Sequence, residues 1–218
     1  MKIKIMVVLG MAMLAGASCN KTDFNYPAGT VGISKIVYFP SVSTNGPHLM
    51  IIAQGAGFTD PGVTATINGQ PVTPTTTGSV DPGTPGVYVI NYSAANAQGF
   101  SASDFRTVVV IGSDVAANDF SGTYLRSATG VTSTWTKDST GVYTVENAGG
   151  AVSGAGLTVV AVNYTGSQIS IPEQTSADYG GVVSSSSETY NATASPVTYS
   201  WIFHAPNYGT GLRTFTKQ

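Results

Sequence analysis

Hydrophobic and polar residues alternate in short runs along most of the chain. In residues 87–92, Val-Tyr-Val-Ile-Asn-Tyr, the set Val87, Val89 and Asn91 alternates with Tyr88, Ile90 and Tyr92, and residues 107–111 are all β-branched. A period of two places successive side chains on opposite faces of a β-strand. We find no apolar run with a helical period after the first 18 residues, so the pattern predicts an all-β protein.

The strands fall into two groups. For a first domain, residues 31–112, we predict strands at residues 33–39, 49–53, 63–67, 87–92 and 107–111. The pair Asn68-Gly69 is a two-residue hairpin signal, and residues 81–86, Asp-Pro-Gly-Thr-Pro-Gly, favour a turn. Short strands separated by turns are typical of a β-sandwich.

A second domain is predicted at residues 119–218, after a polar linker. Its expected strands are residues 133–137, 142–146, 157–163, 168–171, 198–204 and 212–217. The turn at residues 138–141 joins the first two of them into a hairpin. We therefore expect an antiparallel β-meander that forms a small barrel or a sandwich.

The first 18 residues have the order of an export signal. Lys2 and Lys4 precede an apolar run at residues 5–14, which is too short to span a bilayer, and small residues follow at 15–18. Small residues before Cys19 resemble the relaxed lipobox of Bacteroidetes-type lipoproteins. The resemblance implies cleavage before Cys19 and acylation of that residue.

Cys19 is the only cysteine of the chain. An ordinary secreted protein would keep it as a free thiol, which is a liability in an oxidising compartment. Several acyl chains on one residue suffice for stable anchoring. We therefore prefer the interpretation that the protein is a lipoprotein. In this interpretation residues 19–30 comprise the lipidated cysteine and a polar tether, and the membrane is a partner.

Charge excludes one class of partner. Of the nine basic residues, two lie in the signal, so the predicted mature chain of 200 residues has seven basic and eleven acidic side chains, a formal charge of −4. The sequence has no basic stripe, so nucleic acid is not an expected partner.

Residues 85–102, Pro-Gly-Val-Tyr-Val-Ile-Asn-Tyr-Ser-Ala-Ala-Asn-Ala-Gln-Gly-Phe-Ser-Ala, resemble the end of a bacterial immunoglobulin-like (Ig-like) domain. The family pattern is Pro-Gly, alternating Tyr and Val, Ala-x-Asn-x-x-Gly, and a strand that starts near Arg106. The resemblance implies a β-sandwich without the disulfide of antibody domains, carried by surface lipoproteins of glycan-using bacteria. Residues 119–126 resemble the opening of a β-rich domain of unassigned function that often follows it.

No catalytic motif is present. The sequence contains no Gly-x-Ser-x-Gly, no zinc spacing motif and no phosphate-binding glycine loop, and the two histidines, His48 and His204, fall in different predicted domains. A pair of carboxylates among Glu173, Asp178 and Glu188 could serve glycoside hydrolysis, but surface solvation explains them as well. We predict that the protein is not an enzyme and uses neither cofactor nor metal.

Calcium is an alternative at the predicted domain junction. Asp114, Asn118 and Asp119 bring oxygen ligands together there. An ordinary polar linker explains the same residues, and we prefer it.

Glycan binding needs only an accessible aromatic ring and neighbouring polar groups. Trp201 shares an apolar face with its strand neighbours, which predicts a core position. Trp135 shares its face with Ser133 and Lys137, which favours an accessible one. The expected glycan site comprises Trp135 and the loop tyrosines Tyr179 and Tyr208, with Asp178, Asn207 and Glu188 as hydrogen-bonding groups. Packing of the loop tyrosines on the rim of the domain is the competing interpretation.

Our first hypothesis is an outer-membrane, lipid-anchored protein that faces the cell exterior and binds glycan as a non-catalytic accessory of polysaccharide capture. The alternative is a structural or protein-interaction subunit that docks on an outer-membrane transporter or another surface complex. A contiguous apolar patch on the second domain would favour the alternative.

Overall fold

The structure is a computed structural model that describes residues 27–31, 34–152, 157–178 and 180–218. The chain forms two compact units, residues 1–38 and 39–218. In the first, β1 (Thr30–Val31) pairs antiparallel with β2 (Ser34–Lys35). The predicted signal and Cys19 lie outside the described residues, so cleavage and lipidation stay predictions.

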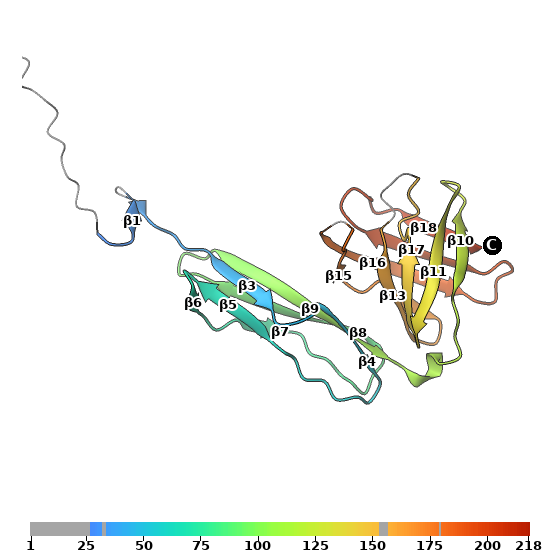
Figure 1. Ribbon diagram of the computed structural model, residues 1–218, viewed down its shortest axis with the longest axis horizontal. Coiled ribbons are helices and arrows are strands. Elements are labelled where there is room, and N and C mark those ends of the chain that lie inside the picture. The colour runs from blue at the N-terminus through green and yellow to red at the C-terminus, as the bar shows by residue number, and fades with distance from the viewer. Residues whose placement is uncertain (1–26, 32–33, 153–156, 179) are drawn as a thin grey trace, which may run out of the picture. The chain divides into compact units, whose positions relative to one another are not determined.

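Two sheets are built from residues 40–111 (Figure 1). One contains, in order, β3 (Pro40–Thr44), β5 (Val63–Ile67) and β6 (Gln70–Pro71); the other contains β4 (Leu49–Ala53), β9 (Ser101–Ile111), β8 (Gly86–Ala95) and β7 (Thr75–Thr77). β4 and β9 pair in parallel, whereas the other pairs of these sheets are antiparallel.

Local sequence explains the clearest of these elements. The predicted strands 49–53 and 63–67 are confirmed residue for residue as β4 and β5. Asn68 and Gly69 have φ values of 51° and 72°, so they close β5 onto β6 in the left-handed conformation that this dipeptide favours. On β8, alternate residues Ile90, Tyr92 and Ala94 are buried. The predicted alternation therefore does place one face of this strand in the core.

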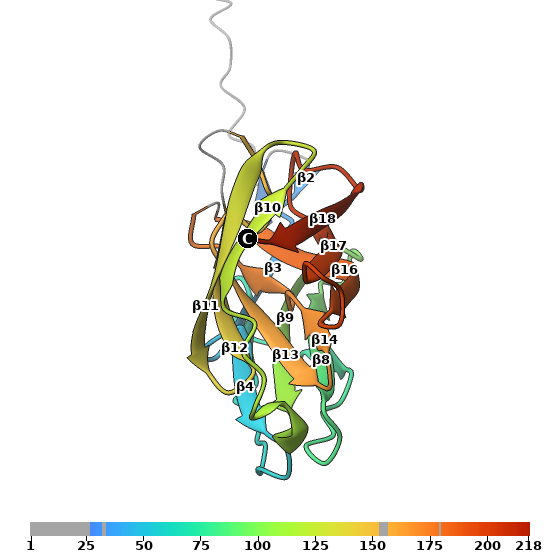
Figure 2. The same cartoon turned by 90° about the vertical axis from the view of Figure 1, so that its right-hand side faces the viewer.

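A single antiparallel sheet contains the strands from residue 122 onward. They are β10 (Gly122–Arg126), β11 (Val131–Ser139), β12 (Val142–Glu146), β13 (Val159–Thr165), β14 (Gln168–Ser170), β15 (Gln174–Thr175), β16 (Val182–Asn191), β17 (Thr198–His204) and β18 (Leu212–Lys217). Their order is β14-β13-β12-β11-β10-β18-β17-β16-β15. The first and last strands of the meander are thus neighbours, and Figure 2 shows β10 to β13 following one another around one side of the sheet.

The two ends of this sheet also meet. The Ser185 backbone N–H donates to the Ile171 carbonyl at 3.0 Å, and the Ile171 N–H donates to the Ser185 hydroxyl at 2.7 Å. β16 is thereby tied to the chain just after β14, and the sheet curls into a barrel-like form that we call the barrel. The predicted all-β class, with an antiparallel meander after the first domain, is confirmed.

Aromatic rings fill the interior of the barrel. Its buried members include Tyr124, Trp135, Tyr143, Tyr199, Trp201, Phe203 and Phe215. Trp135 and Trp201 stack with ring centroids 5.6 Å apart, and the Trp201 indole N–H donates to the Ala148 carbonyl at 3.0 Å. The predicted core position of Trp201 is confirmed.

A small apolar cluster joins the barrel to the strands that precede it. Val109 and Ile111 at the end of β9 pack with Val115 of the 3₁₀ helix η1 (Ser113–Val115) and with Val162 of β13. The Gly112 N–H donates to the Tyr164 carbonyl at 2.8 Å across the same junction. Residues 39–218 form one compact unit, so the predicted boundary between domains at residues 112–119 stays a prediction.

The polar residues of the linker bind the turn between β13 and β14. The Asp114 carboxylate accepts from the Gly166 N–H at 2.7 Å, which lowers the pKa of Asp114, and from the Thr165 hydroxyl at 3.0 Å. The Asn118 amide donates to the Gly166 carbonyl at 2.7 Å and to the Asn163 side chain at 2.8 Å. Through these bonds Asp114 and Asn118 hold the linker to the turn between β13 and β14.

Gly141, in the turn between β11 and β12, is expected to be intolerant of substitution. Its φ is +68°, and a Cβ at this position would overlap the Asn163 carbonyl oxygen. Gly141→Ala should lower the free energy of unfolding by about 1–3 kcal/mol, because it adds a clash to left-handed strain. Gly166→Ala is the matched control, since Gly166 has φ +49° and open space around its Cβ position. Urea unfolding of the two variants should show the larger loss for Gly141; equal losses would contradict the packing argument.

Candidate functional site

A cavity of about 340 Å³ lies beside the strand ends of the barrel. Its walls include Arg126, Gly149, Val152, Asn207, Tyr208 and Arg213. We call it the Tyr208 cavity. It brings together two of the residues that the sequence predicted for a glycan site, Asn207 and Tyr208, in the loop between β17 and β18.

The Tyr208 ring is held in place from several sides. Asn207 has φ +71°, and the Tyr208 N–H donates to the Ala205 carbonyl at 3.1 Å, so the loop turns tightly before the ring. The ring stands edge-on to Phe203 with centroids 5.0 Å apart. A Cβ at Gly149 would overlap the ring, so only glycine allows this approach. Tyr208 is half-buried and presents a fixed aromatic surface to the cavity.

Two arginines, Arg126 and Arg213, form another part of the wall. Arg126 Nη1 donates to the Gly150 carbonyl at 3.0 Å. Arg213 Nη2 donates to the Tyr208 carbonyl, and the Arg213 guanidinium carbon lies 5.3 Å from the centroid of the Tyr208 ring. This distance is within the range of a cation–π contact.

The electrostatic setting of Arg213 is unfavourable to its charge. Burial, and then the positive charge of Arg126, lower the pKa of Arg213, while Tyr208 acts in the opposite direction. Burial raises the pKa of Tyr208, which the Arg213 charge partly offsets. Arginine stays protonated in proteins, so the cavity carries two positive charges at neutral pH.

Sequence reasoning missed both arginines, although the signal was present. Arg126 lies two residues after Tyr124, and Arg213 lies two residues before Phe215. Tyr124 and Phe215 are buried in the barrel, so the period of two directs each arginine to the inner side of its strand. A charged residue on the buried face of a strand is informative because charges are rarely buried unpaired.

The predicted accessible position of Trp135 is wrong. Its side chain is only 1% exposed and packs among the aromatic rings of the barrel. Its neighbour Ser133 is also buried, because its hydroxyl donates to the Glu146 carbonyl at 2.9 Å. A serine whose hydroxyl bonds to a backbone carbonyl can lie on the inner face of a strand. Ser133 beside Trp135 was therefore not a sign of an exposed face.

The other predicted site residues are not among the residues that line the Tyr208 cavity. Asp178 is exposed and accepts from the Thr158 N–H at 2.8 Å. Glu188 accepts from the hydroxyls of Ser185 at 2.6 Å and Ser170 at 3.2 Å, so its carboxylate serves the join between β14 and β16. Tyr179 lies outside the described residues.

The two histidines have separate partners. His48 Nε2 lies 2.9 Å from the Asp104 carboxylate and 3.0 Å from the Thr44 hydroxyl. His204 Nε2 lies 2.6 Å from the Ser186 hydroxyl. Both contacts of His48 are made by the same ring nitrogen. In a nucleophilic triad, one ring nitrogen faces the nucleophile and the other faces the carboxylate, so this arrangement differs from a triad.

A comparison with known families assigns the sheets of residues 40–111. Residues 42–110 match the model of the bacterial surface protein Ig-like domain. The prediction of a bacterial Ig-like domain is thereby confirmed for this segment. We call residues 42–110 the Ig-like domain.

Two solved structures are similar to parts of the chain. A lipoprotein from Bacteroides thetaiotaomicron is 23% identical with a TM-score of 0.38, and the match covers 83% of this chain and all of that one. The catalytic domain with two CBM51 domains of ZmpB from Clostridium perfringens is 10% identical with a TM-score of 0.28, over 59% of this chain and 14% of that one. The search among curated proteins found no match.

The domain match indicates a protein of the bacterial cell surface. Within the part of the chain that the structure describes, no helix is long and apolar enough to cross a membrane.

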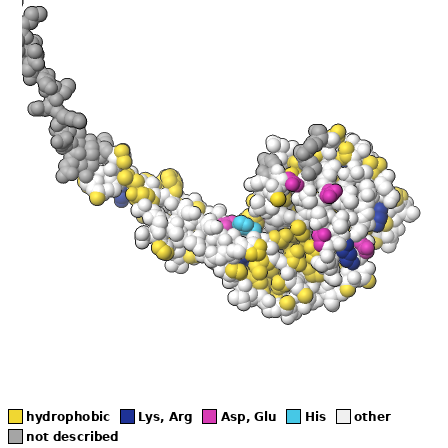
Figure 3. All heavy atoms as spheres, viewed as in Figure 1, with side chains coloured by type: hydrophobic (Ala, Val, Ile, Leu, Met, Phe, Trp, Pro, Cys, Tyr) yellow, Lys and Arg dark blue, Asp and Glu magenta, His cyan; other side chains and the backbone are white. Residues whose placement is uncertain are grey.

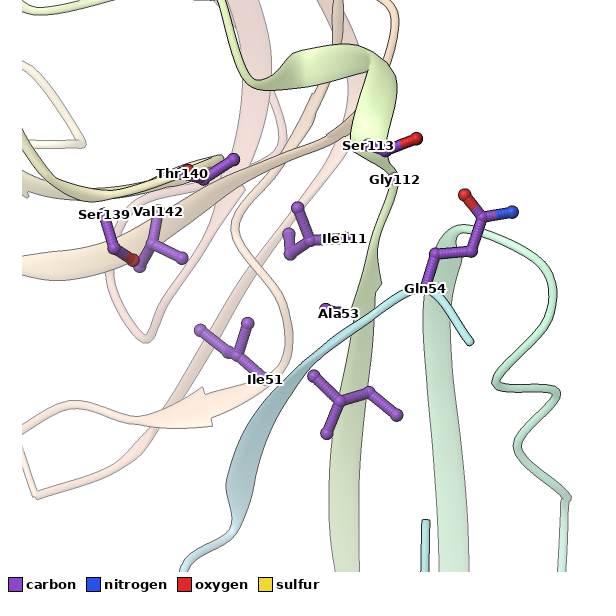
Figure 4. Close-up of a pocket in the computed structure, with 10 residues that line it drawn as sticks. Ile51, Ala53, Gln54, Ile111, Gly112, Ser113, Ser139, Thr140 and Val142 are labelled. Carbon is purple, nitrogen blue, oxygen red and sulfur yellow. The ribbon is translucent and has the colours of Figure 1, made fainter. Parts of the chain in front are cut away.

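A second hollow lies between the Ig-like domain and the barrel. It has a volume of about 510 Å³, and its walls include Ile51 and Ile52 of β4, Ile111 at the end of β9, and Val142 of β12. Figure 4 shows Ile51, Ile111 and Val142 pointing into the same space, with Gln54 and Ser113 at its edge. In Figure 3, hydrophobic side chains gather on the visible face over the region where β4, β8 and β13 lie in Figure 1. The walls of this apolar groove also carry four polar side chains, those of Gln54, Ser113, Ser139 and Thr140.

Proposed function

We propose that the protein is a non-catalytic surface lipoprotein that binds glycan through its barrel. Acylated Cys19 would anchor it in the outer membrane, facing the exterior, and the Ig-like domain would act as a spacer between tether and barrel. This proposal is supported by the predicted export signal, by the resemblance of the residues before Cys19 to a lipobox, and by the match of residues 42–110 to a domain of bacterial surface proteins. Many copies on one surface would raise a modest affinity through multivalency.

The observation that carries the glycan assignment is the Tyr208 cavity. A sugar ring has an apolar C–H face that stacks on an aromatic ring and hydroxyls that need polar partners. Tyr208 supplies a fixed ring, and Asn207 supplies an amide beside it, in one concave site. Such a combination of one rigid aromatic surface and a few polar groups is the usual composition of a small-molecule site.

Tyr208→Ala is expected to weaken glycan binding about tenfold or more, since a central aromatic anchor commonly contributes more than about 1 kcal/mol. The measurement is the retardation of a protein of residues 20–218 in affinity gels that contain plant, host or microbial polysaccharides. This protein contains all residues that the structure describes. Tyr208→Phe should retain binding because it keeps the ring. Tyr88→Ala, at a half-buried tyrosine of the Ig-like domain outside the cavity, is the matched control.

Retardation that is equal for the wild type and a folded Tyr208→Ala variant would reject this site. The absence of retardation by every polysaccharide would favour the alternative, a protein-interaction subunit of a surface complex. The apolar groove between the Ig-like domain and the barrel is the observation in favour of that alternative.

A further inference from the structure

The two arginines of the Tyr208 cavity come from neighbouring strands. β10 and β18 pair antiparallel, with Tyr124 opposite Lys217 and Leu125 opposite Thr216. Continuing this register by one step places Arg126 opposite Phe215, so Arg213 is its diagonal neighbour. Diagonal neighbours on one face of a sheet are close enough for long side chains to interact.

Several N–H groups of these two guanidinium groups have no hydrogen-bond acceptor. Arg213 is only 7% exposed, and its Nε and Nη1 are buried without a hydrogen-bond partner. Arg126 Nε is likewise buried without a partner. The Arg213 Nη2 bond to the Tyr208 carbonyl and the Arg126 Nη1 bond to the Gly150 carbonyl engage only neutral acceptors.

No acidic side chain compensates the two charges among the described residues. The ion pairs found there are His48–Asp104 and Arg106–Asp60, and both belong to the Ig-like domain. A buried charge without an ion-pair partner costs free energy, because it loses its hydration by water and gains no opposite charge in return. The buried Arg213 and the half-buried Arg126 place two charges of the same sign beside one cavity, which makes an anion the complementary occupant.

We propose that the Tyr208 cavity binds an acidic glycan through the carboxylate of a uronic acid. This inference rests on the proposed function and names its ligand class. A planar guanidinium donates in a fork that matches a carboxylate, and Arg126 and Arg213 both border the cavity. The Tyr208 ring beside them packs against the pyranose ring that carries the carboxylate. The entering anion replaces the missing counter-charge.

The test compares polygalacturonate with its methyl ester, which has the same sugar backbone without the negative charge. We expect the chain from residue 20 onward to bind polygalacturonate at least about tenfold more tightly than the ester, since hydrogen bonds to charged groups are the stronger ones. Binding should weaken as salt is raised from about 0.05 to 0.5 M, because ions screen the attraction. Equal binding of acid and ester would overturn the inference.

Arg213→Gln and Arg126→Gln should each weaken polygalacturonate binding at least about tenfold. Arg213→Lys, which keeps the charge but loses the fork, should give an intermediate loss. The matched control is Lys35→Gln, which removes one positive charge from an exposed position in β2. Circular dichroism identifies variants that fail to fold. If Arg213→Gln does so, Arg126→Gln and the acid–ester comparison decide the question.

Three further results separate this inference from the proposed function. Retention of a neutral polysaccharide that depends on Tyr208, without retention of polygalacturonate, would uphold glycan binding and overturn the carboxylate assignment. Failure of both would reject both. Dextran sulfate binding as tightly as polygalacturonate, with plain dextran unbound, would show general anion attraction and overturn the preference for a carboxylate.

Discussion

Replacement of Arg106 by methionine is expected to lower the free energy of unfolding by about 3–5 kcal/mol, because it removes a buried guanidinium that pairs with the partly exposed Asp60 carboxylate and donates to three backbone carbonyls. Arg106 is completely buried on β9. Its Nε lies 3.1 Å from the Asp60 carboxylate, and its Nη2 donates to the carbonyls of Asn45 at 2.9 Å and Gly62 at 3.2 Å. Its Nη1 donates to the Pro47 carbonyl. Methionine fills much of the volume but satisfies none of these acceptors.

Urea unfolding of residues 20–218, followed by circular dichroism, measures this loss. Lys35→Met is the matched control, because Lys35 is exposed and a surface change of this kind is expected to alter stability by no more than about 0.5 kcal/mol. A loss of less than about 1 kcal/mol for Arg106→Met would show that the carbonyls find other donors.

Acidification supplies a second readout of the same ion pair. Burial alone would raise the pKa of Asp60, but hydrogen bonds from Gly62 and Tyr92 and the charge of Arg106 together lower it below 3.8. A depressed pKa contributes stability above the ordinary value and loses it as the pH falls through the folded-state pKa. Arg106→Met removes part of that depression. The stability difference between wild type and variant should therefore narrow below about pH 4; a difference that widens would contradict the pairing.

Trp135→Ala should destabilise the barrel by about 3–5 kcal/mol, as is usual when a large buried aromatic side chain is truncated. The indole ring lies 5.6 Å from Trp201, 5.2 Å from Tyr199 and 5.5 Å from Tyr143, centroid to centroid. Its removal leaves a cavity, and the neighbouring rings could fill that cavity only by giving up their present contacts with one another. Thermal and urea unfolding followed by circular dichroism measure the effect.

Trp135→Phe is the control for this variant, since it keeps an aromatic ring and should cost less. Both variants, under conditions in which they are folded, should retain any polysaccharide that retards the wild type. A Trp135→Ala variant that has wild-type stability but no longer binds glycan would contradict this prediction and would indicate that Trp135 takes part in glycan binding.

The strands that were predicted correctly have strong local patterns. Residues 142–146, 198–204 and 212–217 coincide with β12, β17 and β18, because alternation or β-branched residues identify a strand without knowledge of its neighbours. β16 was missed, since Val182–Asn191 contains four consecutive serines and no apolar alternation. Its place in the sheet depends on pairing with β17 and on hydroxyl hydrogen bonds such as that between Thr189 and Ser200 at 2.7 Å.

The predicted strand at residues 33–39 was largely wrong. Among the described residues 34–39, Ser34–Lys35 form a strand and residues 36–39 have no strand structure, and the first sheet of the larger unit begins at Pro40. Apolar residues in this segment imitate a strand pattern. Phe39 nevertheless remains exposed and packs against Phe100 with ring centroids 4.9 Å apart. Composition alone does not distinguish such a contact from a buried strand face.

The sequence by itself determined the all-β class, the bacterial Ig-like domain and the presence of Tyr208 in a loop. These features depend on residues one or a few positions apart, where periodicity and turn chemistry act directly. Only the tertiary structure decided that Trp135 is buried and that Arg126 and Arg213 share a cavity with Tyr208. The pairing of β10 with β18 joins the two ends of the meander, and no local pattern specifies which distant strands become neighbours or which charges they leave without a partner.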